Sequence, residues 1–146
     1  MIIRLQPEPA AYRYMWAALT QDHVQQYIDP EWQGPDGYHA LCRMLDEGHW
    51  FAVPVIGGEA GGLVWGEVCG CDELEGHLAF NRKISTSELL GSMEEIFEYC
   101  STEFKKIRVV KDNLHRAARM FIRRCGFESD GDFFTKDLTP WQQQQA

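Results

Sequence analysis

The chain has 146 residues, of which 45% are hydrophobic and 25% charged, and its formal net charge at pH 7 is −8. This composition indicates a folded chain whose core needs no disulfide or metal, and it excludes disordered, collagen-like and coiled-coil proteins. The acidic balance argues against nucleic-acid binding. The apolar runs are too short to span a membrane, and the N-terminus lacks a signal-peptide pattern. Five scattered cysteines, interpreted as reduced thiols, predict a cytoplasmic protein.

The first third of the chain predicts one short strand and two helices. Weak alternation over 2–5 indicates a strand. Apolar residues at helical spacing over 10–28 indicate a helix, which Asp29-Pro30 ends. A loop rich in Gly and Pro precedes a second helix over 38–47, which Gly48 closes.

The middle of the chain predicts three strands in succession. The segments 50–56 and 63–71 are rich in strand-forming residues and flank a glycine-rich turn at 57–62. A third strand is predicted over 74–80. This arrangement is typical of an antiparallel meander.

The last part of the chain alternates helices and strands. A capping box at 85–88, with Ser85 as N-cap, opens a helix that continues to Cys100. A strand over 106–110 is followed by a helix over 112–125, which Gly126 ends.

A terminal hairpin is predicted next, with a strand entered at Phe127, a turn at 129–132 and a return strand over 133–138. The resulting order, β-α-α-β-β-β-α-β-α-β-β, predicts an α/β fold, specifically an α+β mixed sheet flanked by helices. We expect a single domain over 1–138 and a frayed C-terminal tail over 139–146.

The charges are unevenly distributed along the chain. Residues 1–81 hold three basic and twelve acidic residues, whereas residues 82–146 hold eleven basic and ten acidic residues. Eight of the basic residues lie between Lys105 and Arg124. This stretch is either a solvated basic face or a site for a small anionic ligand.

The element order, together with the helix that runs through 118–127 into Cys125-Gly126-Phe127, resembles the GNAT superfamily of N-acetyltransferases. The resemblance in element order covers nearly the whole chain. It implies acetyl-CoA as the acyl donor and cosubstrate, and transfer of its acetyl group to an amine. The acceptor would be a small-molecule amine, or the N-terminus or a lysine of a protein.

The resemblance also implies a set of residues that bind acetyl-CoA. The family's pyrophosphate loop corresponds to residues 82–87, and the backbone amides of the preceding strand would bind the oxyanion. Exposed arginines of the late helix would meet either the 3′-phosphate of CoA or an acidic partner. The cofactor-binding residues expected on this basis are Ala79, Phe80, Asn81, Arg82, Lys83, Ser85, Thr86, Ser87, Arg116 and Arg119.

The sequence departs from the family pattern at two places. Ser85 and Ser87 stand where the loop has glycine and glycine or alanine, and the capping box would itself satisfy helix N–H groups that phosphate needs. Ile122 occupies the position where many members carry a proton-donating tyrosine. The alternative is therefore a non-catalytic GNAT-like binding or assembly module, a pseudoenzyme with a protein partner, similar to small GNAT-like proteins of tailed phages.

Two residues of the central strands are candidates for the general base. Glu67 and His77 each stand in an otherwise apolar strand, where burial can tune a carboxyl or imidazole group. The alternative is an outward-facing Glu67 and a hydrogen-bonded structural His77. Cys69 and Cys71 share one strand face, but no second ligand pair lies nearby, so we expect no metal site.

Overall fold

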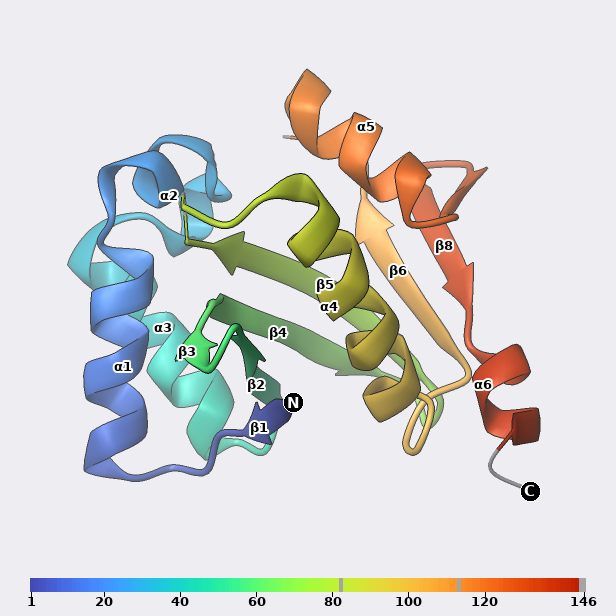
Figure 1. Ribbon diagram of the computed structural model, residues 1–146. Coiled ribbons are helices and arrows are strands. Elements are labelled where there is room, and N and C mark those ends of the chain that lie inside the picture. The colour runs from blue at the N-terminus through green and yellow to red at the C-terminus, as the bar shows by residue number, and fades with distance from the viewer. Residues whose placement is uncertain (82, 113, 145–146) are drawn as a thin grey trace. The chain divides into compact units, whose positions relative to one another are not determined.

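A computed structural model describes residues 1–81, 83–112 and 114–144 (Figure 1). It has the predicted mixed α/β class, with an eight-stranded, mostly antiparallel sheet in the described part of the chain. The chain divides into two compact units, one of residues Met1–Glu67 and His77–Ile84, the other of Val68–Gly76 and Ser85–Ala146. Strands β4 (Gly62–Cys69) and β5 (Glu73–Phe80) contribute to both units. The single-domain organisation of 1–138 stays a prediction.

The first unit combines three α-helices with the start of the sheet. Strands β1 (Ile2–Arg4) and β4 pair antiparallel with opposite edges of β2 (Trp50–Ile56), and the two-residue β3 (Glu59–Ala60) forms a hairpin with the end of β2. Gly57 and Gly58 form the hairpin turn with φ of 62° and 81°, which favour glycine.

The helices of this unit contact one another and enclose its core. They are α1 (Pro9–Leu19), α2 (Asp22–Tyr27), the 3₁₀ helix η1 (Pro30–Trp32) and α3 (Gly34–Asp46). Helix α1 contacts both α2 and α3, and η1 contacts α3 (Figure 1). The fully buried side chains of this core include Met15, Leu41, Phe51 and Trp65.

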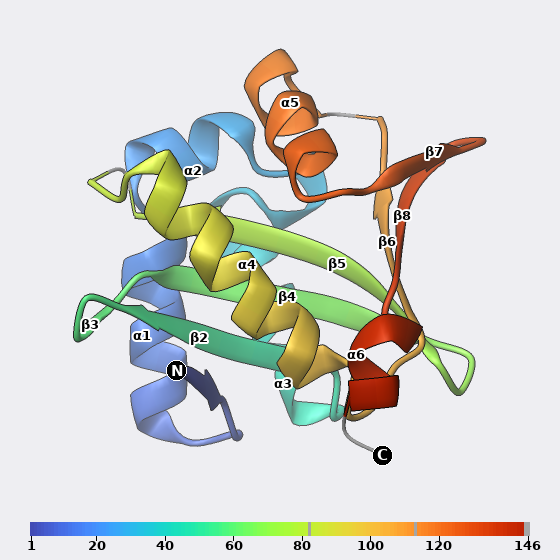
Figure 2. The same cartoon turned by 45° about the vertical axis from the view of Figure 1, so that its right-hand side comes forward.

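The second unit contains the remaining helices and strands. Its elements are α4 (Thr86–Cys100), β6 (Lys106–Val110), α5 (Arg116–Arg124), β7 (Glu128–Asp130), β8 (Phe133–Asp137) and α6 (Thr139–Gln144). Strand β6 runs parallel to β5 over Glu73–Glu75 and antiparallel to β8 along its whole length. Strands β7 and β8 form the terminal hairpin (Figure 2).

The structure corrects the first predicted helix and the start of the second. Instead of one helix over 10–28, α1 and α2 are separate, because the hydroxyl of Thr20 donates to the Trp16 carbonyl (2.7 Å) and Gln21 is extended. Helix α3 starts at Gly34 rather than at Tyr38. Proline suits the first turn of a helix, so the Gly-Pro segment that predicted a loop lies inside α3.

The two C-terminal helices also differ from the prediction. Helix α5 starts at Arg116, since His115 is its N-cap and accepts a hydrogen bond from the Ala118 N–H (3.4 Å). Residues 139–144, predicted to fray, form α6. Gln142 donates from its side chain to the carbonyls of Ser101 (3.1 Å) and Phe104 (3.0 Å), so contacts distant in sequence hold this helix.

The described residues include no membrane-spanning helix and no disulfide. None of their helices is both long and apolar enough to cross a bilayer. None of the five cysteines, all of which the structure describes, is in a disulfide.

Candidate functional site

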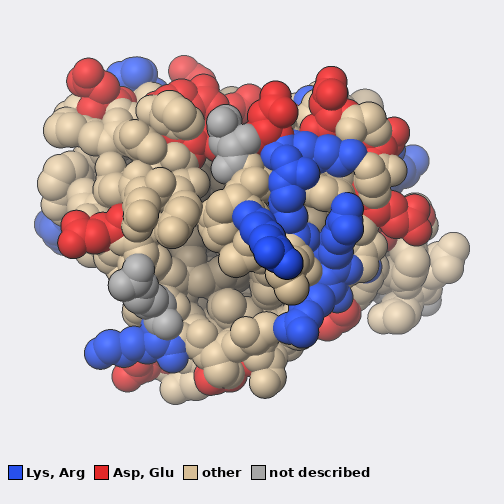
Figure 3. Space-filling model, turned by 90° about the horizontal axis from the view of Figure 1, so that it is seen from above, with Lys and Arg blue, Asp and Glu red and all other residues tan. Residues whose placement is uncertain are grey.

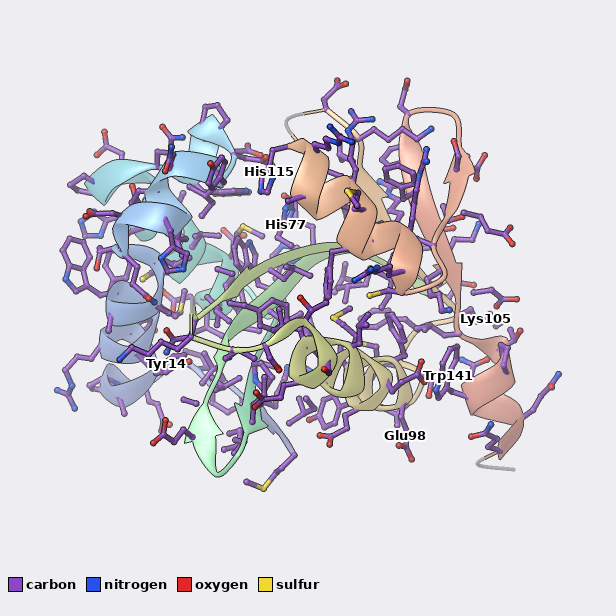
Figure 4. All side chains as sticks on the ribbon, turned by 45° about the horizontal axis from the view of Figure 1, so that its top comes forward. Tyr14, His77, Glu98, Lys105, His115 and Trp141 are labelled. Atoms are coloured by element: carbon purple, nitrogen blue, oxygen red, sulfur yellow. The ribbon has the colours of Figure 1, made fainter. Side chains whose placement is uncertain are left out.

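His77 of β5 lies in an aromatic and acidic environment within the first unit (Figure 4). Its ring stacks on Trp65 of β4, with ring centres 5.5 Å apart and planes at 24°. The ring of Trp32 meets it edge-on at 6.1 Å. Asp29 Oδ2 lies 3.9 Å from His77 Nδ1, and both side chains are mostly buried, with 26% and 15% exposed. These contacts fix the plane of the imidazole and place an anion beside one of its nitrogens.

Glu67, the other candidate for the general base, lies beside His77, which the sequence did not predict. The two come from the neighbouring strands β4 and β5, and an oxygen of Glu67 is within 4.8 Å of a ring nitrogen of His77. Glu67 is half-buried. A carboxylate and an imidazole at this separation can attract an ammonium group and accept a proton from it. Their catalytic role stays a prediction.

Sequence reasoning missed Asp29 and Trp32 as parts of this site. The sequence pattern indicates only that Asp29-Pro30 ends a helix. Its carboxylate reaches His77 because the turn after α2 leads directly into η1, where the Trp32 N–H donates to the Asp29 carbonyl (2.9 Å). No local pattern signals a contact between residues so distant in sequence.

The backbone at the end of β5 is partly engaged by the protein. The Asn81 N–H, one of the expected oxyanion donors, already donates to the Gly61 carbonyl (2.9 Å). The Phe80 carbonyl lies 3.0 Å from His23 Nε2. In this conformation the backbone N–H of Asn81 is therefore not available to an oxyanion, and the expected roles of Ala79 and Phe80 stay predictions.

The start of α4 forms the predicted N-cap. Ser85 Oγ accepts from the Glu88 N–H (3.3 Å) and lies 2.9 Å from Glu88 Oε1, to which it donates. Ser85, Thr86 and Ser87 are exposed, as is Lys83, whereas Arg82 lies outside the described residues. The helix start thus presents exposed hydroxyls together with one carboxylate.

The arginines of α5 are exposed on the second unit. Lys and Arg side chains gather over this helix (Figure 3). Arg119 donates from Nε to the Leu114 carbonyl (3.1 Å) and from Nη2 to the Lys111 carbonyl (3.0 Å), so part of its guanidinium holds the segment before the helix. Arg116 is exposed at the first position of α5. Ile122 is buried, with 3% exposed.

No protein-family model matches the sequence, and no curated protein sequence matches it. Solved structures do match it. The aminoglycoside N(6′)-acetyltransferase from Legionella pneumophila subsp. pneumophila str. Philadelphia 1 is 13% identical, with a TM-score of 0.71, covering 98% of this chain and 95% of that one. Spermidine N-acetyltransferase from Vibrio cholerae, in complex with CoA and spermine, is 14% identical, with a TM-score of 0.71 and 97% of both chains covered.

A third similar structure names the superfamily. It is a GNAT superfamily phosphinothricin acetyltransferase from Sinorhizobium meliloti in complex with acetyl-CoA, 12% identical, with a TM-score of 0.64, covering 94% of this chain and 87% of that one. The chain has the fold of the GNAT acetyltransferases, which confirms the fold that the sequence predicts. The predicted likeness to phage proteins gains no support from these comparisons.

Proposed function

We propose that the chain is an acetyl-CoA-dependent N-acetyltransferase that acts on a small-molecule amine. The fold supports this proposal, and the observation that carries it is the pairing of Glu67 with His77 on neighbouring strands. Similar folds occur in proteins named as spermidine and aminoglycoside acetyltransferases, whose acceptors are amines. The cytoplasmic location that the reduced cysteines predict suits an enzyme that uses acetyl-CoA.

We assign complementary roles to the two residues. Acetyl-CoA supplies an activated acetyl group. Glu67 attracts the ammonium form of the acceptor, and His77 takes the proton that this nitrogen must lose before its lone pair can attack the thioester carbonyl. The nitrogen gives up its second proton to water or to the departing CoA thiolate as the amide forms. Imidazole suits this step because it exchanges protons near neutral pH. The trigonal carbonyl then becomes a tetrahedral oxyanion, for which the Ala79 and Phe80 amides are the expected donors, and the CoA thiolate leaves.

The affinity for acetyl-CoA would depend on the cofactor-binding residues that the sequence predicts. Arg82, Lys83 and the hydroxyls and amides of 85–87 would bind the pyrophosphate, and Arg116 and Arg119 the 3′-phosphate. We expect Arg82→Ala to weaken CoA binding by about 1.5–3 kcal/mol, the scale of a charge-assisted hydrogen bond. An unchanged affinity for CoA would show that Arg82 does not bind the cofactor.

The first test is calorimetric titration with acetyl-CoA and with CoA, followed by an acetylation assay with spermidine and an aminoglycoside as probe amines. We expect micromolar cofactor binding. Glu67→Gln and His77→Gln should reduce kcat/KM by about 10²–10⁴ while leaving CoA affinity unchanged. His39→Gln, on the exposed face of α3, is the matched control and should retain full activity. Equal activity in all three variants would exclude Glu67 and His77 from the chemistry.

A non-catalytic module is the second candidate function. Two observations favour it: the Ser85–Glu88 interaction occupies a helix N–H and brings a carboxylate to the helix start, and Ile122 is buried and apolar. Absence of binding heat, and of any melting-temperature shift at millimolar acetyl-CoA, would favour this function and a protein partner.

A further inference from the structure

We infer that Asp29 is a positioning residue that holds His77 in the tautomer with its proton on Nδ1, which leaves Nε2, buried in this conformation, as the basic nitrogen that would accept the substrate proton. This inference rests on the proposed function for the role of His77 in catalysis. The tautomer itself is a property of the folded chain and can be measured without any substrate.

The geometry around His77 carries the inference. The Asp29 carboxylate faces Nδ1 at 3.9 Å, which is an ion-pair distance and longer than a hydrogen bond. An anion on this side attracts a hydrogen at Nδ1 and therefore favours that tautomer. The stack on Trp65 and the edge contact with Trp32 restrain rotation of the ring, so the two nitrogens keep distinct surroundings.

The chain holds Asp29 in place through its backbone. Pro30 fixes the start of η1, and the Trp32 N–H closes the turn on the Asp29 carbonyl (2.9 Å). Gly37 lets α3 approach this turn closely, since a Cβ there would lie 2.1 Å from the Trp32 carbonyl carbon. These backbone contacts on the C-terminal side of Asp29 hold its carboxylate beside His77.

The competing hypothesis is that another acidic group near His77 determines its tautomer. Glu67 lies within 4.8 Å of the ring. Glu75, two residues earlier on β5, is paired with Arg108, whose Nε lies 3.4 Å from Glu75 Oε1. If Glu67 rather than Asp29 controlled the ring, removing Glu67 would change the tautomer and removing Asp29 would not.

The test is long-range ¹H–¹⁵N NMR of protein labelled with ¹⁵N-histidine, at a pH where the imidazole is neutral. His77→Gln assigns the signal. We expect the Nδ1–H tautomer in the wild type, a shift toward the Nε2–H tautomer in Asp29→Asn, and no change in Glu67→Gln. Asp22→Asn, exposed at the start of α2, is the matched control and should leave the signals of His77 unchanged.

The kinetic readout follows in the acetylation assay. Asp29→Asn should lower kcat by about tenfold or more with little change in KM, and Asp29→Glu should restore part of the loss. An Nε2–H tautomer in the wild type, or an unchanged tautomer in Asp29→Asn, would overturn the inference. Should Asp29→Asn fail to fold, an Nε2–H tautomer in the wild type, or a changed tautomer in Glu67→Gln, would still overturn the inference. An inactive protein with the Nδ1–H tautomer would instead contradict the proposed function.

Discussion

Gly62, the first residue of β4, leaves no room for a side chain. Its φ of 142° is one that other residues rarely adopt, and an added Cβ would lie 2.1 Å from the Ala79 carbonyl oxygen and 2.9 Å from the Phe80 Cα. Its own carbonyl accepts a hydrogen bond from the Tyr14 hydroxyl. This close approach joins β4 to the end of β5, where the oxyanion donors are expected.

We therefore expect Gly62→Ala to destabilise the protein by about 2 kcal/mol or more, since it combines backbone strain with a backbone clash. Gly91→Ala is the matched control. Gly91 lies inside α4 with nothing within 4 Å of an added Cβ, so the same substitution should stabilise the protein by about 0.5–1 kcal/mol. Denaturant unfolding measures both, and equal effects would contradict the clash.

At the scale of an element, α6 depends on the carboxylate of Asp137. The backbone N–H of Thr139 donates to it (3.0 Å), as does the Thr139 hydroxyl (2.9 Å), and these hydrogen bonds lower the pKa of the Asp137 carboxyl. A group whose pKa is lowered by folding stabilises the folded state above its ordinary pKa, about 4 for Asp. That contribution is lost as the pH falls through the lower, folded pKa.

Asp137→Ala should accordingly lower the free energy of unfolding near pH 7, because it removes both hydrogen bonds to Thr139. The difference from the wild type should shrink as the pH falls below about 4 and through the lowered pKa of the folded state, because the wild-type carboxyl is then protonated too. Denaturant unfolding at several pH values, down to the lowest at which both proteins fold, measures the difference. A difference that stays constant with pH would show that the carboxylate charge is unimportant.

The start of α4 carries a second prediction at this scale. Glu88 places a negative charge in the first turn, where the helix dipole favours anions and where the pyrophosphate is expected. Glu88→Gln removes the charge that competes with phosphate, so we expect CoA to bind several-fold more tightly by calorimetry. Glu98→Gln, in the last turn of the same helix, is the control and should not change the affinity. Weaker binding in Glu88→Gln would assign Glu88 a supporting role instead.

At the scale of the whole molecule, the chain is acidic, with a net charge of −8, although the surface of α5 is basic. At physiological salt charges interact over only about 8 Å, so the arginines of α5 would have to supply the attraction for DNA by themselves, and so few phosphate contacts bind weakly. We expect no mobility shift of duplex DNA at about 0.15 M salt. A shift that survives this salt and is lost in Arg116→Ala would show that α5 binds polyanions in general rather than a small phosphate ligand.

Local patterns in the sequence determined most of the element order. Apolar periodicity and turn glycines are short-range signals, so β2, β5, β6 and the hairpin of β7 and β8 lie close to their predicted bounds. The cap of α4 followed from Ser85 and Glu88 alone. The same local reasoning failed for α6, because its hydrogen bonds reach residues distant in sequence.

For the candidate site too, the sequence predicts one part and only the tertiary structure shows the rest. From the sequence alone, Glu67 and His77 were candidates because they are polar residues in otherwise apolar strands, and the fold was predicted from the order of the elements. Only the tertiary structure decided that these two lie together, that Asp29 faces His77, and that the Asn81 amide is already engaged by Gly61. The physical reason is that periodicity gives the face on which a residue lies, whereas its partners depend on how strands and turns distant in sequence are packed.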